Sequence, residues 1–149
     1  MSLKNNNIIT IDGPSASGKG SLAKALAKEL NFILLDSGLL YRAYSYCFDH
    51  SQKHSLAMDL FSQLNIQSID HQMHVFENKK DITSILRHED VAKFASELSS
   101  FKETRDNLIS FQRDLASDHG LVADGRDMGT VVFPDAGTKI FLVADVEVR

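Results

Sequence analysis

The chain has 149 residues, of which 43% are hydrophobic and 24% charged, and its formal net charge is −4. These values describe one ordinary soluble domain that can bury a working core. The negative charge argues against a broad nucleic-acid surface, no apolar run has the length of a membrane span, and the single cysteine, Cys47, excludes a disulfide framework. We therefore expect a cytoplasmic protein without nucleic-acid or membrane partners, in which Cys47 is a buried apolar group.

The first 50 residues predict a strand, a helix, a second strand and a second helix. The apolar run Asn7–Asp12 (NIITID) is typical of a buried parallel strand. Apolar residues then recur at helical spacing over Ser21–Leu30, and Phe32–Leu35 is another short apolar run. A turn at Asp36–Gly38 is expected to lead into a helix that ends near His50. The first three elements form a βαβ unit, which implies a parallel sheet.

The middle of the chain has a different pattern. Residues 55–64 predict a helix, whereas residues 65–83 alternate between apolar and polar residues and contain a polar turn at Glu77–Lys80. Helical spacing returns at 89–100 and 101–116, and two apolar strand candidates follow at 121–124 and 139–145. The predicted fold class is therefore α/β, with a core of residues 1–52 and 101–149 and a smaller α+β insert of residues 53–100.

A glycine-rich sequence, IDGPSASGKGS, connects the first strand to the first helix. Backbone N–H groups of such a turn, followed by a helix N-terminus, form a donor site for phosphate oxygens. Gly13, Gly18 and Lys19 match the phosphate-binding loop, but Gly20 occupies the usual hydroxyl position and Ser21 comes one residue later. That displacement favours a nucleoside-monophosphate kinase over a nucleoside triphosphatase, whose hydroxyl after the lysine binds magnesium. A glycine-rich turn with an ordinary surface lysine is the structural alternative.

The segment Asn78–Asp81 (NKKD) matches a guanine-binding motif of GTPases. However, no aspartate of the chain has glycine three residues later, so the companion switch motif is missing. The segment also falls in the polar turn of the insert. We therefore interpret it as turn chemistry.

A kinase that transfers a phosphoryl group between two anionic substrates also needs arginines, because guanidinium groups bind phosphate oxygens in a bidentate way. Arg42, Arg105 and Arg126 are candidates. Arg126 follows an apolar strand, at the sheet edge where open α/β folds bind ligands. Asp124 at that strand end has the position of a carboxylate that organises magnesium, and Asp127 is a candidate hydrogen-bond acceptor. Capping of the strand end is the structural alternative for both aspartates.

These motifs together resemble the bacterial cytidylate kinase family. The segments IDGPSASGKGS, LLDSGLLYR and ADGRDMGTVVFPDA carry the resemblance, which runs from about Ile8 to Arg149. It implies a nucleoside-monophosphate kinase fold whose insert is the CMP-binding domain. It also implies that the arginine-rich lid and the last strand and helix are absent from this chain, which ends on a strand with its covering helix just begun.

The resemblance implies two sets of site residues. The ATP-binding loop would consist of Gly13, Pro14, Ser15, Ala16, Ser17, Gly18, Lys19, Gly20 and Ser21. The CMP-binding residues would be Ser37, Gly38, Tyr41, Arg42, Ser96, Arg105, Asp124, Arg126 and Asp127. Lys19, Arg126 and Asp124 would be catalytic, and magnesium would arrive with ATP and be organised by Asp124 and Ser21.

The resulting expectation is a monomeric enzyme that phosphorylates CMP or dCMP with ATP and Mg²⁺. Because lid arginines supply charge stabilisation and exclude water, we expect this chain itself to be a poorly active fragment. Two alternatives stay open. The chain could bind nucleotides without catalysis, or it could belong to another small-molecule kinase with the same phosphate-binding loop.

Overall fold

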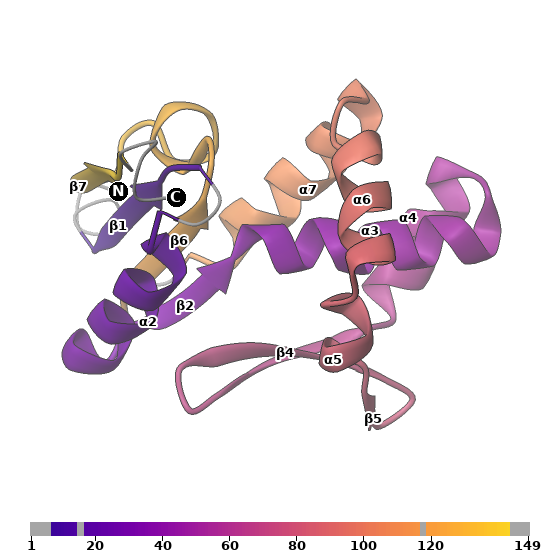
Figure 1. Cartoon of the computed structure of the whole chain (residues 1–149), viewed down its shortest axis with the longest axis horizontal. Coiled ribbons are helices and arrows are strands. Elements are labelled where there is room, and N and C mark those ends of the chain that lie inside the picture. Colours follow the sequence, from indigo (N-terminus) through magenta and orange to yellow (C-terminus); the bar gives the residue numbers. More distant parts are fainter. Residues whose placement is uncertain (1–6, 15–16, 117–118, 144–149) are drawn as a thin grey trace. The chain divides into compact units, whose positions relative to one another are not determined.

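A computed structural model describes residues 7–14, 17–116 and 119–143 (Figure 1). The chain forms two compact units. The first comprises residues 1–37, 70–72 and 112–149, and the second comprises residues 38–69 and 73–111. The limit at residues 37 and 38 falls at the start of the helix Ser37–Ser51, and the limit at residues 111 and 112 falls near the end of the helix Lys102–Asp114. The functional division into a core of 1–52 and 101–149 and an insert of 53–100 stays a prediction.

The first unit is built on a parallel sheet in the strand order β2-β6-β1-β7. Its strands are β1 (Ile8–Asp12), β2 (Ile33–Asp36), β6 (Leu121–Gly125) and β7 (Thr138–Phe141). All five residues of β6 are buried, as expected for an inner strand of a parallel sheet. The register pairs Asp36 with Asp124 and Asp12 with Gly125. The predicted α/β class is confirmed, and the sheet brings three aspartates to the carboxyl ends of neighbouring strands.

Helix α2 (Lys19–Leu30) covers this sheet and begins two residues before the predicted start. Its buried residues Ala23 and Ala27 pack against a cluster formed by Ile11, Leu34 and Val122. Small residues on this face let the helix approach the strands closely. Asn31 ends the helix in the left-handed conformation, with φ of 56°.

A five-residue π-helix, η1 (Met128–Val132), follows β6 and was not predicted. The N–H of Val132 donates to the carbonyl of Asp127, and that of Phe133 to the carbonyl of Met128. Arg113 donates to the carbonyl oxygens of Val131 and Val132. The arginine thereby satisfies carbonyl groups at the end of this short helix, which its own backbone leaves open.

The second unit contains most of the helices and a three-stranded sheet. The helices are α3 (Ser37–Ser51), α4 (His54–Ser62), α5 (Thr83–Leu86), α6 (Glu89–Leu98) and α7 (Lys102–Asp114), and the sheet has the order β3-β4-β5. The turn predicted at Asp36–Gly38 is wrong, because α3 begins at Ser37 directly after β2. Cys47 is buried as predicted, and burial raises the pKa of its thiol to about 12. It is therefore an unreactive thiol at neutral pH.

The strands of the second sheet are β3 (Asn65–Ile69), β4 (Gln72–Glu77) and β5 (Lys80–Asp81). Asn78 and Lys79 connect β4 to β5 and both have positive φ, at 50° and 69°. Glu77 pairs with Lys80 across the turn. Two positive φ values in a two-residue connection are the geometry of a type I′ hairpin turn. The NKKD segment is therefore a hairpin turn followed by the two residues of β5, and its first half confirms the turn that the sequence predicts.

Replacing Lys79 by glycine is expected to stabilise the chain by about 0.5–1 kcal/mol, because glycine adopts positive φ without the steric cost that a Cβ carries. Urea denaturation measures this difference. The matched control is Lys80→Gly in the neighbouring strand position, which should destabilise the chain because strand glycines lose entropy and packing. Equal effects of the two substitutions would contradict the turn assignment.

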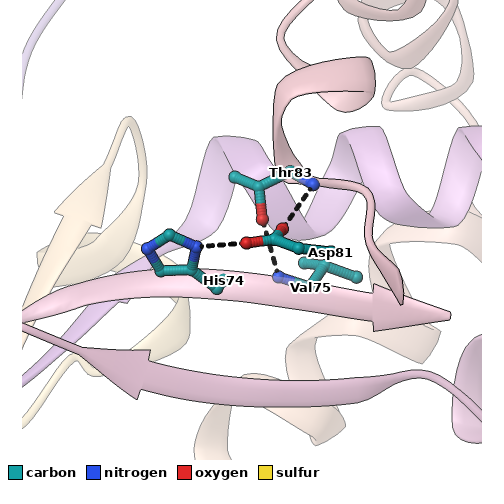
Figure 2. Close-up of polar contacts among 4 residues, drawn as sticks. All are labelled: His74, Val75, Asp81 and Thr83. Atoms are coloured by element: carbon teal, nitrogen blue, oxygen red, sulfur yellow. Dashed lines mark hydrogen bonds and ion pairs between the residues drawn. The ribbon is translucent and has the colours of Figure 1, made fainter. Parts of the chain in front are cut away.

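A network of hydrogen bonds connects the hairpin of β4 and β5 to α5 (Figure 2). Nδ1 of His74 and Oδ2 of Asp81 are 2.8 Å apart, and the N–H of Thr83 donates to Oδ1 of Asp81 at 2.9 Å. The N–H of Val75 donates to the Thr83 hydroxyl. The bonds from Thr83 and His74 lower the pKa of Asp81 to about 2. A lowered pKa means that the network stabilises the fold above about pH 4 and that this contribution is lost as the pH falls toward 2.

Among the described residues, no helix combines the length and the apolar character needed to cross a membrane.

Candidate functional site

The candidate site starts at the connection between β1 and α2, where two positions require glycine. A Cβ on Gly13 would lie 2.8 Å from the carbonyl oxygen of Leu142, closer than carbon approaches such an atom. Gly18 has φ of 87° and precedes the first residue of α2. A side chain at position 13 would collide with the backbone of Leu142, and the positive φ at position 18 is unfavourable for residues with a Cβ. Both positions therefore favour glycine. Pro14 and Ser17 are described, whereas the predicted loop residues Ser15 and Ala16 lie outside the described residues.

Lys19, the first residue of α2, forms an ion pair with Asp124 on β6. The distance between Nζ and Oδ1 is 3.3 Å. A Cβ on Gly20 would lie 3.7 Å from Oδ2 of the same carboxylate, so the position after Lys19 also faces Asp124. Ser21, the displaced hydroxyl, is exposed in the first turn of α2. The structure thus brings Lys19 and Asp124, two of the three predicted catalytic residues, together at the carboxyl ends of the strands.

Asp124 is a buried carboxylate in an environment that opposes its charge. Its residue surface is 8% exposed. Burial raises its pKa, the neighbouring carboxylates of Asp36 and Asp12 act in the same direction, and Lys19 acts against them. A charged group held in a desolvated position next to other carboxylates is typical of functional sites, because the fold alone gains nothing from it.

Asp12 is a further residue of this site that sequence reasoning did not select. It is 6% exposed, and its two carboxylate oxygens accept hydrogen bonds from the N–H groups of Met128 and Gly129 at 2.7 and 2.8 Å. The only local signal was an acidic residue at the end of an apolar strand, directly before the glycine loop. Its partners lie more than 110 positions away in the sequence, so no local pattern could identify them.

Besides Asp124, three further predicted acceptor-side residues lie in the first unit at the ends of adjacent strands. Ser37 is buried and follows β2, whereas Arg126 is exposed, Asp127 is half-buried, and both follow β6. Because β2 and β6 are paired, all three lie at the same carboxyl edge as Lys19 and Asp124. That edge is where open α/β sheets bind ligands.

The other predicted acceptor-side residues belong to the second unit. Gly38, Tyr41 and Arg42 lie in the first turns of α3, Ser96 lies on α6 and Arg105 on α7. Tyr41 and Arg42 are half-buried, whereas Ser96 and Arg105 are exposed. They come from three separate helices, and their role as a set stays a prediction.

Comparison with known proteins identifies the family of the chain. The profile of the family described as "Cytidylate kinase" matches residues 9–149. The chain belongs to the cytidylate kinase family. The phosphate-binding loop, the Lys19–Asp124 pair and the segment that carries Arg126 all lie within the matched region. The resemblance inferred from the sequence is therefore confirmed at the level of the family.

Individual relatives are similar over nearly the whole chain. A cytidylate kinase of Pseudomonas fluorescens is 45% identical over 95% of this chain and 66% of the relative's length. A cytidylate kinase of Pasteurella multocida is 40% identical over 99% of this chain and 67% of its own length. A protein named cytidylate kinase 2 from Haemophilus influenzae is 43% identical over 95% of this chain. The chain thus spans about two thirds of the length of the curated relatives that it matches.

Proposed function

We propose that the chain carries the nucleotide-binding core of an enzyme that transfers the γ-phosphoryl group of ATP to CMP or dCMP. The observation that supports this most is the Lys19–Asp124 pair at the end of the glycine loop. A lysine at this position neutralises the β- and γ-phosphates of a bound nucleotide, while the loop N–H groups bind their oxygens. Membership of the cytidylate kinase family supports CMP or dCMP as the acceptor.

Asp124 fits a magnesium ion that accompanies the ATP. Its Oδ1 is buried and accepts no well-aligned hydrogen bond from the described residues, although Lys19 lies beside it. Magnesium prefers carboxylate oxygens together with phosphate oxygens and water. When bound, the ion neutralises charge on the β- and γ-phosphates. Asp124 would hold it directly or through water, and the Ser21 hydroxyl lies in the adjoining turn of α2.

In the proposed reaction a phosphate oxygen of CMP forms a bond to the γ-phosphorus, and the bond from that phosphorus to the oxygen shared with the β-phosphate breaks. ADP leaves with those electrons. No covalent enzyme intermediate is required, so the side chains act by positioning and by charge. Lys19 would hold the donor, and Arg42, Arg105 and Arg126 would orient the acceptor phosphate. Ser37, Gly38, Tyr41, Ser96 and Asp127 would complete the acceptor site.

An assay of ADP release with CMP, dCMP, UMP and AMP as acceptors tests the reaction. Calorimetry with the same nucleotides tests binding independently of turnover. We expect CMP or dCMP to bind tightest, and turnover of this chain to be low. Binding of CMP without any turnover would favour the alternative of a nucleotide-binding fragment. Preference for a different acceptor would favour another small-molecule kinase.

We further propose that the protein is monomeric and lies in the cytoplasm.

Replacing Arg126 by alanine is expected to weaken CMP binding by about 10- to 100-fold, because hydrogen bonds to charged groups contribute about 1.5–3 kcal/mol. Calorimetry with CMP measures the change. The matched control is Lys102→Ala, which removes an exposed cation that pairs with Asp106 on α7. This control should leave the affinity unchanged. Equal losses in the two variants would show that only the overall charge matters and would remove Arg126 from the acceptor site.

A further inference from the structure

The carboxylate of Asp12 accepts hydrogen bonds from the backbone of the segment that follows β6. Asp12 is the last residue of β1, and each of its oxygens accepts one N–H group, from Met128 and from Gly129. Burying an aspartate is costly unless its charge is hydrogen-bonded. Short, paired hydrogen bonds from backbone N–H groups compensate that cost. The side chain therefore links the end of β1 to the segment that follows β6.

These bonds fix the segment that carries Arg126 and Asp127 at both ends. On one side, Gly125 is still part of β6 and pairs with Asp12 across the sheet. On the other side, Asp12 binds the first two N–H groups of η1. Only Arg126 and Asp127 lie between these two attachment points. The exposed Arg126 side chain therefore extends from a backbone that is held in place.

Close packing restricts the same segment further. A Cβ on Gly129 would lie 2.7 Å from the Thr10 hydroxyl, and a Cβ on Gly125 would lie 2.8 Å from the Met128 side chain. The η1 segment thus lies directly against β1, with no space for a larger residue at position 129. The carbonyl of Asp12 also accepts the N–H of Leu142 after β7. One residue therefore joins the ends of three neighbouring strands immediately before Gly13.

We propose that Asp12 is a positioning residue that sets the Arg126–Asp127 segment in register with the phosphate-binding loop. This inference rests on the proposed function, in which the loop binds the donor and Arg126 the acceptor. The side chain touches neither substrate. It acts by making the start of the loop and the acceptor segment parts of one rigid unit, so that the two phosphates meet at a fixed separation.

The substitution Asp12→Asn tests this role, because the amide keeps the shape but places an NH₂ group against one of the two N–H donors. We expect CMP affinity to fall at least 10-fold in calorimetry, while ATP affinity changes less than 3-fold. The amide proton signals of Met128 and Gly129 should move upfield in NMR spectra, since hydrogen bonds to a carboxylate shift them downfield. Asp12→Glu should not restore CMP binding, because the extra methylene group displaces the carboxylate from the positions that face the two N–H groups.

The matched control is Thr10→Val, another buried position of β1 beside η1 whose hydroxyl makes no hydrogen bond with the described residues. It measures the purely structural cost of altering this strand. If Asp12→Asn and Thr10→Val lower stability and both affinities alike, Asp12 has only a structural role and the inference is wrong. Normal CMP binding by Asp12→Asn contradicts the positioning role alone. Failure of the unsubstituted chain to bind CMP contradicts the proposed function as well.

Discussion

Gly120→Ala is expected to lower the free energy of unfolding by about 2–4 kcal/mol, a large part of the 5–15 kcal/mol typical of a domain. Gly120 has φ of 104°, and a Cβ there would lie 2.4 Å from the ring of Phe32. The left-handed backbone costs an L-residue about 1–2 kcal/mol, and overpacking adds about 1–3 kcal/mol. The ring cannot move aside freely, because Phe32 packs against the cluster of Ile11, Leu34 and Val122.

Gly18→Ala provides the matched control, because Gly18 also has positive φ but a Cβ there would meet nothing within 4 Å. Its expected cost is about 1 kcal/mol, from the backbone alone. A double-mutant cycle with Phe32→Ala isolates the clash: removing the ring should make Gly120→Ala much less costly. Urea denaturation of the unsubstituted chain, Gly120→Ala, Phe32→Ala and the double variant measures the cycle. Additive effects would show that Phe32 and Gly120 do not restrict each other.

Local patterns in the sequence predicted the elements that depend on neighbouring residues. The glycine loop, the helix after it and the buried strands were recognised because spacing and residue type are sufficient for each. The same holds for the turn at Asn78–Lys79, where asparagine tolerates positive φ better than most residues. The order of the strands was not predictable in this way, since the pairing of β1 with both β6 and β7 depends on contacts between distant segments.

The π-helix and the role of Asp12 were missed for a related reason. A five-residue helix shows no repeating apolar pattern, and MGTVV contains residues that favour strands more than helices. Its conformation depends on hydrogen bonds from Met128 and Gly129 to Asp12 and on the close approach of Gly129 to Thr10. The ADGRDMGT motif could thus be recognised as a whole, while the physical reason for its glycines required the structure.

Lys19→Met and Asp124→Asn are expected to change stability in opposite directions while both weaken binding of ATP with magnesium by at least 10-fold. Methionine keeps the length of Lys19 but removes the cation that compensates the buried Asp124 carboxylate. The folded chain should then be less stable at neutral pH, since an unpaired buried charge is costly. Asparagine at position 124 removes that charge and should add about 1 kcal/mol of stability, a gain often found when a functional residue is replaced.

The pH dependence separates this explanation from a general packing effect. Burial raises the pKa of Asp124 above the ordinary aspartate value of 3.8, so the folded chain binds more protons than the unfolded chain just above that pH. Stability contributed by this group therefore falls as the pH rises from about 4 through the folded-state pKa. Relative to Asp124→Asn, the unsubstituted chain should lose stability over that range, and Lys19→Met should lose more. Urea denaturation between pH 4 and 8 measures these slopes, and the double variant should behave like Asp124→Asn. Parallel curves for the unsubstituted chain and Lys19→Met would mean that Lys19 does not influence the charge of Asp124.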